Sequence, residues 1–126
     1  MIGGVGIDLV EIARFRAAMS RHGDRFLVKI FTARERKYCE GKWNRLAHYT
    51  ARFAAKEAVL KALGTGWSGG IHWTDVEVSH AGTGEVRVKL AGAAAAAARR
   101  KKIHTVHLNI THSERYAAAV AVAESR

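Results

Sequence analysis

The sequence predicts an α+β fold in which helices pack on a mainly antiparallel sheet. Helical periodicity dominates the first half of the chain after one initial strand, whereas most strand-like segments lie in the second half. Turn-forming residues at 81–84 and 112–115 join these later strands. The length of 126 residues fits one domain with one core, which we expect to span residues 1–126.

The first half begins with a predicted strand over residues 2–10. Its side chains alternate between an aliphatic row and a second row that contains Asp8, so Asp8 projects from the face opposite the aliphatic side chains. A helix from Glu11 to about His22 follows. Residues 26–31 are apolar but ambiguous. Thr32 and Glu35 have the spacing of a capping box, which predicts a short helix over 33–40.

The strongest helix prediction covers residues 45–63. Its apolar side chains recur on one side, and Gly64 provides a stop signal. These apolar residues are Leu46, Tyr49, Phe53, Leu60 and Leu63. Glu57 occupies a position in this stripe where an aliphatic side chain would be expected. The exception marks Glu57 as a candidate functional residue.

The second half contains a glycine-rich loop at 64–70, strands near 75–79 and 85–90, and an alanine-rich helix from residue 93. An alternating strand over 105–111 comes next. The segment 116–123 is apolar on both parities, which predicts a strand buried on both faces.

Charge indicates the kind of partner but not its identity. The 21 lysines and arginines against 11 acidic residues give a net charge of +10, which attracts polyanions. Nucleic acid, anionic lipid, a phosphorylated cofactor and an acidic protein all remain possible on this ground.

Cys39 is the single cysteine, so no intrachain disulfide can form. Without a long apolar stretch or a basic signal region, we expect a cytoplasmic protein.

Two carboxylates in apolar surroundings, Asp8 and Glu57, are candidate metal ligands. Mg²⁺ commonly binds one or two carboxylates while phosphates and water complete its coordination. The alternative is that each carboxylate is salt-bridged to one of the many basic side chains.

Lys61 and Gly64 share a helical face with Glu57. This arrangement is suited to binding a pyrophosphate that also contacts loop N–H groups near Gly64 and Gly66. Lys61 could instead form an ordinary i,i+4 pair with Glu57.

His112 ends a predicted strand at a turn, where its side chain should be exposed and held by rigid structure. A histidine there could relay protons or bind a phosphate. With seven histidines in the chain, an ordinary surface side chain is the alternative.

Three segments together resemble the signatures of the holo-acyl-carrier-protein synthase family. They are Gly6-Ile7-Asp8-Leu9-Val10-Glu11, then Arg52-Phe53-Ala54-Ala55-Lys56-Glu57-Ala58-Val59-Leu60-Lys61-Ala62-Leu63-Gly64, and His107-Leu108-Asn109-Ile110-Thr111-His112-Ser113. The resemblance implies that Asp8 and Glu57 hold Mg²⁺ on the pyrophosphate of coenzyme A, which Lys61 also contacts. It further implies that Arg52 and His112 lie near the coenzyme A phosphates. Asn109 stands where the family usually has serine.

The resemblance also implies the reaction and its partners. A serine of an acidic acyl carrier protein would attack the β-phosphorus of coenzyme A and receive 4′-phosphopantetheine. Candidates for the base that takes the serine proton are Glu57 acting through a metal-bound water, Glu35 and His112, in this order of preference. Arg14, Arg16 and Arg21 would form a basic patch that meets the carrier. The family further implies a homotrimer with active sites between subunits, and neither nucleic acid nor membrane as a partner. The alternative function is that of a small basic nucleic-acid-binding module.

Overall fold

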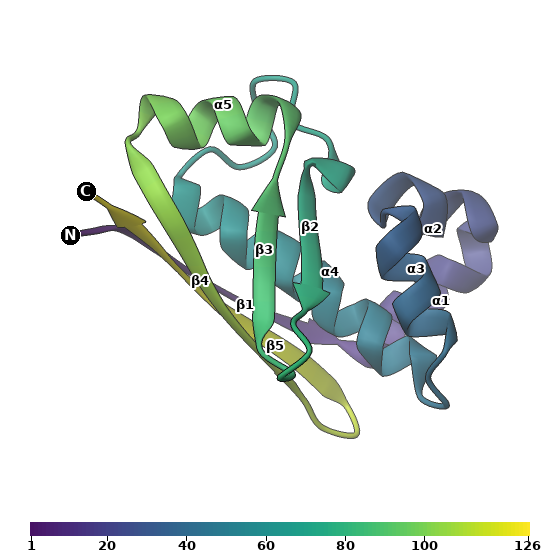
Figure 1. Ribbon diagram of the computed structural model, residues 1–126. Coiled ribbons are helices and arrows are strands. Elements are labelled where there is room, and N and C mark those ends of the chain that lie inside the picture. Colours follow the sequence, from purple (N-terminus) through teal and green to yellow (C-terminus); the bar gives the residue numbers. More distant parts are fainter.

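The computed structural model describes residues 1–126 and shows two antiparallel sheets with helices around them (Figure 1). In chain order the elements are β1 (Ile2–Glu11), α1 (Ile12–His22), α2 (Asp24–Ile30), α3 (Ala33–Glu40), α4 (Arg45–Leu63), a 3₁₀ turn η1 (Trp73–Asp75), β2 (Val76–His80), β3 (Val86–Leu90), α5 (Gly92–Arg100), β4 (Ile103–His112) and β5 (Tyr116–Ser125). The predicted α+β class is confirmed. The ambiguous segment at 26–31 belongs mostly to the short helix α2.

The helix α4 is the centre of the structure, lying between the two sheets (Figure 1). One sheet has the strand order β1-β5-β4, and the other is the β2–β3 hairpin. The main core joins α4 to both sheets and to α5 through small and aliphatic side chains, among them Val59, Val76, Ala98 and Ala121. The N-terminal and C-terminal strands run side by side, so the two chain ends meet, with the Met1 amino group 2.9 Å from the Ser125 carbonyl oxygen. None of the helices is both long and apolar enough to cross a bilayer.

A second, aromatic core holds α1, α2 and α3 against the first half of α4. Phe15 contributes from α1, Phe31 from the segment before α3, and Tyr49 from α4. Cys39 is buried in this core, and burial raises the pKa of its thiol to about 12. The thiol is therefore protonated at neutral pH, which is consistent with a packing role. The capping box of Thr32 and Glu35 is present at the start of α3, as predicted.

Two glycines allow β1 to lie directly on α4. A Cβ atom at Gly4 would overlap the Ala62 carbonyl oxygen, and one at Gly6 would overlap the Ala58 carbonyl oxygen. Because side chains alternate along a strand, the row that contains these glycines and Asp8 faces α4. The aliphatic row faces away from the helix.

The outer face of the three-stranded sheet is open, apolar along β1 and β5, and polar along β4, which contributes exposed His107 and Asn109. Ile7 is 68% exposed, and Tyr116 and Val120 of β5 are 43% and 40% exposed. The prediction that residues 116–123 are buried on both faces is therefore wrong: the alanines from 117 to 123 at every second position pack on α4, while no element of the chain covers the other face. Apolar residues at both odd and even positions predicted that both faces of the strand are buried. Within the chain, only the face toward α4 is buried.

The contact between β1 and α4 predicts a large difference between two glycine substitutions. Gly6→Ala should destabilise the protein by several kcal/mol, because the new methyl group meets helix backbone that cannot move aside. Gly3→Ala is the matched control, since its methyl group would clash only with the end of the Ile103 side chain and would meet its other neighbours at ordinary contact distances. Urea denaturation followed by circular dichroism measures both. Equal midpoints for the two variants would contradict this account of the contact.

Candidate active site

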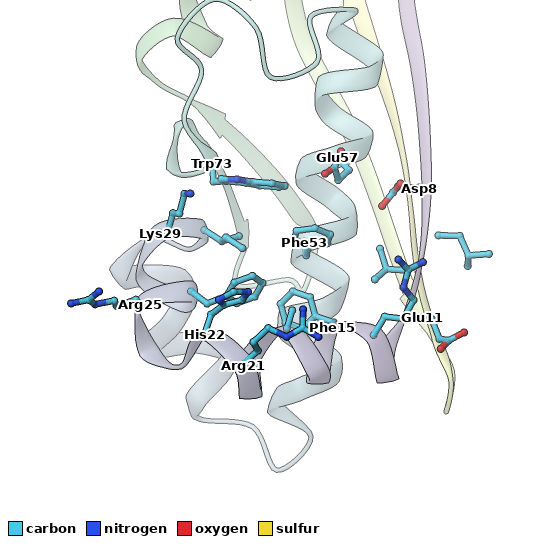
Figure 2. Close-up of a pocket in the computed structure, with 16 residues that line it drawn as sticks. Asp8, Glu11, Phe15, Arg21, His22, Arg25, Lys29, Phe53, Glu57 and Trp73 are labelled. Carbon is cyan, nitrogen blue, oxygen red and sulfur yellow. The ribbon is translucent and has the colours of Figure 1, made fainter.

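A cleft of about 1000 Å³ lies between β1, α1, α2 and α4. Figure 2 shows Phe15, Phe53 and Trp73 among its lining side chains, with acidic groups at one end and basic groups along the helical wall. The Phe53 and Trp73 rings are stacked, with centroids 5.0 Å apart. The cleft therefore has an apolar aromatic surface between regions of opposite charge.

Asp8 and Glu57 lie together at the acidic end of the cleft (Figure 2). Asp8 comes from the inner face of β1, and Glu57 from α4. Burial raises the pKa of Glu57, and the Asp8 charge raises it further, while the Trp67 indole and Lys61 oppose this shift. Glu57 takes part in no ion pair. The structure thus brings the two predicted metal ligands into one cleft and leaves Glu57 there without an ion-pair partner.

This pair of carboxylates fits a hard divalent cation. No group of three or more histidine, cysteine or acidic side chains that could enclose a metal occurs in the chain. Mg²⁺ needs no such cage, because it keeps several waters and binds phosphate oxygens beside one or two carboxylates. The donor set is therefore suited to a metal ion that arrives with a phosphorylated ligand.

Lys61 joins this group through Asp8. Its Nζ donates to the Asp8 carboxylate at 3.1 Å and to the Ile7 carbonyl at 2.9 Å. The alternative of a Lys61–Glu57 pair is thus wrong, because β1 approaches α4 closely enough to supply Asp8 as the partner. About half of the lysine side chain remains exposed, at 53%.

The glycine-rich loop after α4 offers fewer free donors than expected. Gly64 has a φ of 72°, and its N–H caps the helix by donating to carbonyls of the last turn. The Thr65 N–H also donates back into the helix, to the Leu60 carbonyl. The expectation that the Gly64 N–H serves a phosphate is corrected for this reason, whereas Gly66 keeps an N–H outside the helix.

Arg52 and His112 lie together, but away from the cleft. Arg52 is five residues before Glu57 on α4, which turns it about 140° around the helix axis. Its side chain is 0% exposed, and it contacts Tyr38 and His80. His112 is the last residue of β4, and the centroid of its ring lies 5.6 Å from that of the His48 ring on α4. The predicted phosphate contacts thus form two separate groups within the chain.

Glu35 is not available as a base. Its carboxylate is fully buried and accepts hydrogen bonds from Lys56 Nζ at 2.8 Å and from the Val78 N–H at 2.8 Å. Its position in the interior corrects this candidate assignment. Lys56 also donates to the Trp73 carbonyl at 3.1 Å, so the buried pair fixes the backbone beside the cleft.

The basic wall of the cleft extends beyond the predicted basic patch on α1. Arg14 of α1 lines it. Arg21 of α1 and Arg25 and Lys29 of α2 also line it (Figure 2). None of the four takes part in an ion pair. The spacing from Arg25 to Lys29 is that of one helical turn, but the sequence assigns no helix to residues 26–31. Arg16 of the predicted patch does not line the cleft.

Comparison with known proteins agrees with this arrangement. The sequence profile of the 4′-phosphopantetheinyl transferase superfamily matches residues 4–121. The chain belongs to this superfamily. A holo-[acyl-carrier-protein] synthase from Koribacter versatilis is 44% identical over 98% of this chain and 99% of its own length. As a member of this superfamily the chain is a transferase, and the alternative of a nucleic-acid-binding module is not favoured.

Solved structures of phosphopantetheinyl transferases have the same fold. The holo-[acyl-carrier-protein] synthase of Neisseria meningitidis superposes with a TM-score of 0.92 at 29% identity, covering 99% of this chain and 100% of the other. The enzyme from Bacillus anthracis, determined in complex with CoA (3′,5′-ADP), superposes with a TM-score of 0.82 at 34% identity, covering 100% and 99%.

Proposed function

We propose that the chain, as one catalytic domain over residues 1–126, transfers 4′-phosphopantetheine from coenzyme A to a serine of an apo acyl carrier protein. The observation that carries this proposal is the pair Asp8 and Glu57 in a cleft with a basic wall. The similarity to an enzyme determined with a coenzyme A ligand supports it. The second product would be adenosine 3′,5′-bisphosphate.

Asp8 and Glu57 would hold Mg²⁺, which when bound neutralises charge on the pyrophosphate. Lys61, held beside Asp8, would donate to phosphate oxygens. The aromatic surface of Phe53 and Trp73 would accommodate apolar parts of the substrate and limit access of water. Positioning and charge stabilisation then account for most of the catalysis, as in other phosphoryl transfers.

In the transfer step, the serine hydroxyl oxygen forms a bond to the β-phosphorus while the bond from that phosphorus to the bridging oxygen breaks. The electron pair leaves with adenosine 3′,5′-bisphosphate, and the serine proton passes to a base. Among the three candidate bases, only Glu57 lies in the cleft of its own chain. We therefore assign Glu57 to this role, with His112 of a neighbouring copy as the alternative.

Mass spectrometry of an apo carrier protein tests the proposal directly. Incubation with the enzyme, coenzyme A and Mg²⁺ should add one phosphopantetheine mass to the carrier, and EDTA should abolish the change. Asp8→Asn and Glu57→Gln should each slow the reaction at least about a hundredfold, the scale of losing a charge-stabilising group. Glu114→Gln is the matched control, because Glu114 is exposed and outside the cleft. An unmodified carrier with the intact enzyme would exclude the proposed function.

The four unpaired cations along the cleft fit an acidic carrier. Arg14 and Arg21 are exposed on one side of α1, and their positive field extends over the entrance to the carboxylate end. Complementary charge accelerates encounter and orients the partner. We therefore place the carrier on the α1–α2 wall, with its serine directed toward Glu57.

Removing two of these charges should affect the carrier selectively. We expect an Arg14→Ala/Arg21→Ala double variant to raise KM for the carrier about tenfold or more at low salt, and less at high salt, because exposed charges are screened. An Arg99→Ala/Arg100→Ala double variant at the end of α5 is the control for net charge, because it also removes two cations. Steady-state kinetics at several ionic strengths measures this effect. A KM for the carrier that is independent of both the double substitution and salt would count against this docking face.

The open apolar face supports the expected homotrimer. Ile7 on β1 and Val120 on β5 are exposed large aliphatic side chains on the same outer face. Association of copies through this face would cover it. It would also allow the exposed His112 of one copy to approach Asp8 and Glu57 of another, which a single chain keeps apart.

A lysine in this face should reduce the oligomer. We expect Ile7→Lys to lower the molar mass measured by multi-angle light scattering, because an interface would bury the new charge without a partner. Val28→Lys is the control, since Val28 is similarly exposed, at 54%, but lies on α2. An unchanged trimer in the Ile7 variant, or a monomeric unmodified protein, would refute an interface at this face.

A further inference from the structure

One side chain, that of Trp67, attaches the exposed part of the glycine-rich loop, residues 66–70, to the rest of the protein. No backbone hydrogen bond joins these residues to another element, and the Ser68 hydroxyl donates only to the Thr65 carbonyl at the start of the loop. Three glycines have positive φ angles and open space around them: Gly66, Gly69 and Gly70. Trp67 is half-buried and packs against the main core. The loop therefore takes its position from Trp67.

Trp67 extends the aromatic wall of the cleft toward its acidic end. The centroids of the Trp67 and Trp73 rings are 3.7 Å apart, and Trp73 in turn stacks on Phe53 at 5.0 Å. Phe53 and Glu57 are four residues apart on α4, so their side chains lie one turn apart on the same side of the helix. Figure 2 shows the Trp73 side chain beside the turn of α4 that carries both residues. The aromatic contacts therefore lead from the loop to the level of Glu57.

The indole N–H of Trp67 is the hydrogen-bond donor next to the Glu57 carboxylate, and it lowers the pKa of Glu57 against the larger effect of burial. No ion pair competes with it, because Lys61 bonds Asp8 instead. A single N–H occupies one carboxylate oxygen and leaves the other oxygen for a metal ion. Trp67 and a divalent cation can therefore bind the same carboxylate together.

A carboxylate on a flexible side chain loses conformational freedom when it binds a metal, and a partner that orients it beforehand reduces this cost. The Trp67 ring is suited to this task, because its contact with Trp73 restricts its own rotation. We propose that Trp67 is a positioning residue, whose indole holds one oxygen of Glu57 so that the other faces the divalent cation. This inference rests on the proposed function. It gives the glycine-rich loop a part in the metal site besides any contact that its N–H groups make with phosphate.

Trp67→Phe tests the inference, because it keeps an aromatic ring on Trp73 and removes the N–H. Electron paramagnetic resonance of Mn²⁺, with coenzyme A present and no carrier, measures metal binding without turnover. The dissociation constant of Mn²⁺ should rise about tenfold, the scale for losing a hydrogen bond to a metal ligand. The rate of carrier modification at limiting Mg²⁺ should fall in proportion, and saturating Mg²⁺ should restore it. Trp43→Phe is the matched control, since Trp43 is 96% exposed and does not line the cleft.

Nuclear magnetic resonance of the unsubstituted protein gives a second measurement, which does not depend on the folding of a variant. Adding Mg²⁺ to the complex with coenzyme A should shift the indole N–H resonance of Trp67, because the cation withdraws electrons from the accepting carboxylate. The resonance of the exposed Trp43 should stay in place.

Any of four outcomes would overturn the inference. They are an unchanged Mn²⁺ affinity in Trp67→Phe, a loss of rate that saturating Mg²⁺ does not restore, an equal loss of affinity in Trp43→Phe, and a Trp67 resonance that Mg²⁺ leaves in place. An unsubstituted enzyme that neither binds coenzyme A nor modifies the carrier would refute the proposed function instead.

Discussion

The site depends on the close approach of β1 to α4. At Gly4 and Gly6 the strand backbone lies where a side chain would collide with helix carbonyls. This approach brings Asp8, two residues after Gly6, into the cleft beside Glu57, and allows Lys61 to bond the strand. The glycine before the aspartate therefore has a mechanical role: it lets a strand residue and a helix residue share one small space.

A buried ion pair supports the other side of the cleft. Glu35 and Lys56 connect α3, α4 and the start of β2, and every oxygen of the carboxylate has a donor. Such a pair adds little net stability compared with apolar packing, but its geometry is specific. Through the Trp73 carbonyl it holds the aromatic surface opposite the carboxylates. A lysine and a glutamate adjacent in the sequence, Lys56 and Glu57, thus have different tasks because α4 turns them to different sides.

The same division applies to the phosphate contacts. Glu57 and Arg52 lie on one helix but face different surroundings, an acidic cleft and a basic aromatic cluster. The open apolar face of the β1-β5-β4 sheet is a physical reason for copies to associate. In such an assembly, complementary halves from two chains would complete a binding site for a polyanion, which is consistent with the lack of an ion-pair partner for Glu57 and for Arg52 within their own chain.

The sequence by itself determined the α+β class, the secondary structure apart from α2, and Asp8 and Glu57 as candidate metal ligands. Periodicity and capping signals are local, and a carboxylate within an apolar helix stripe is visible without coordinates. The tertiary structure alone decided the partner of Lys61, the burial of Glu35 and Arg52, and the basic wall that includes Arg25 and Lys29. These features depend on which elements pack against each face of α4, and contacts between residues distant in the chain leave no periodic signal in either segment.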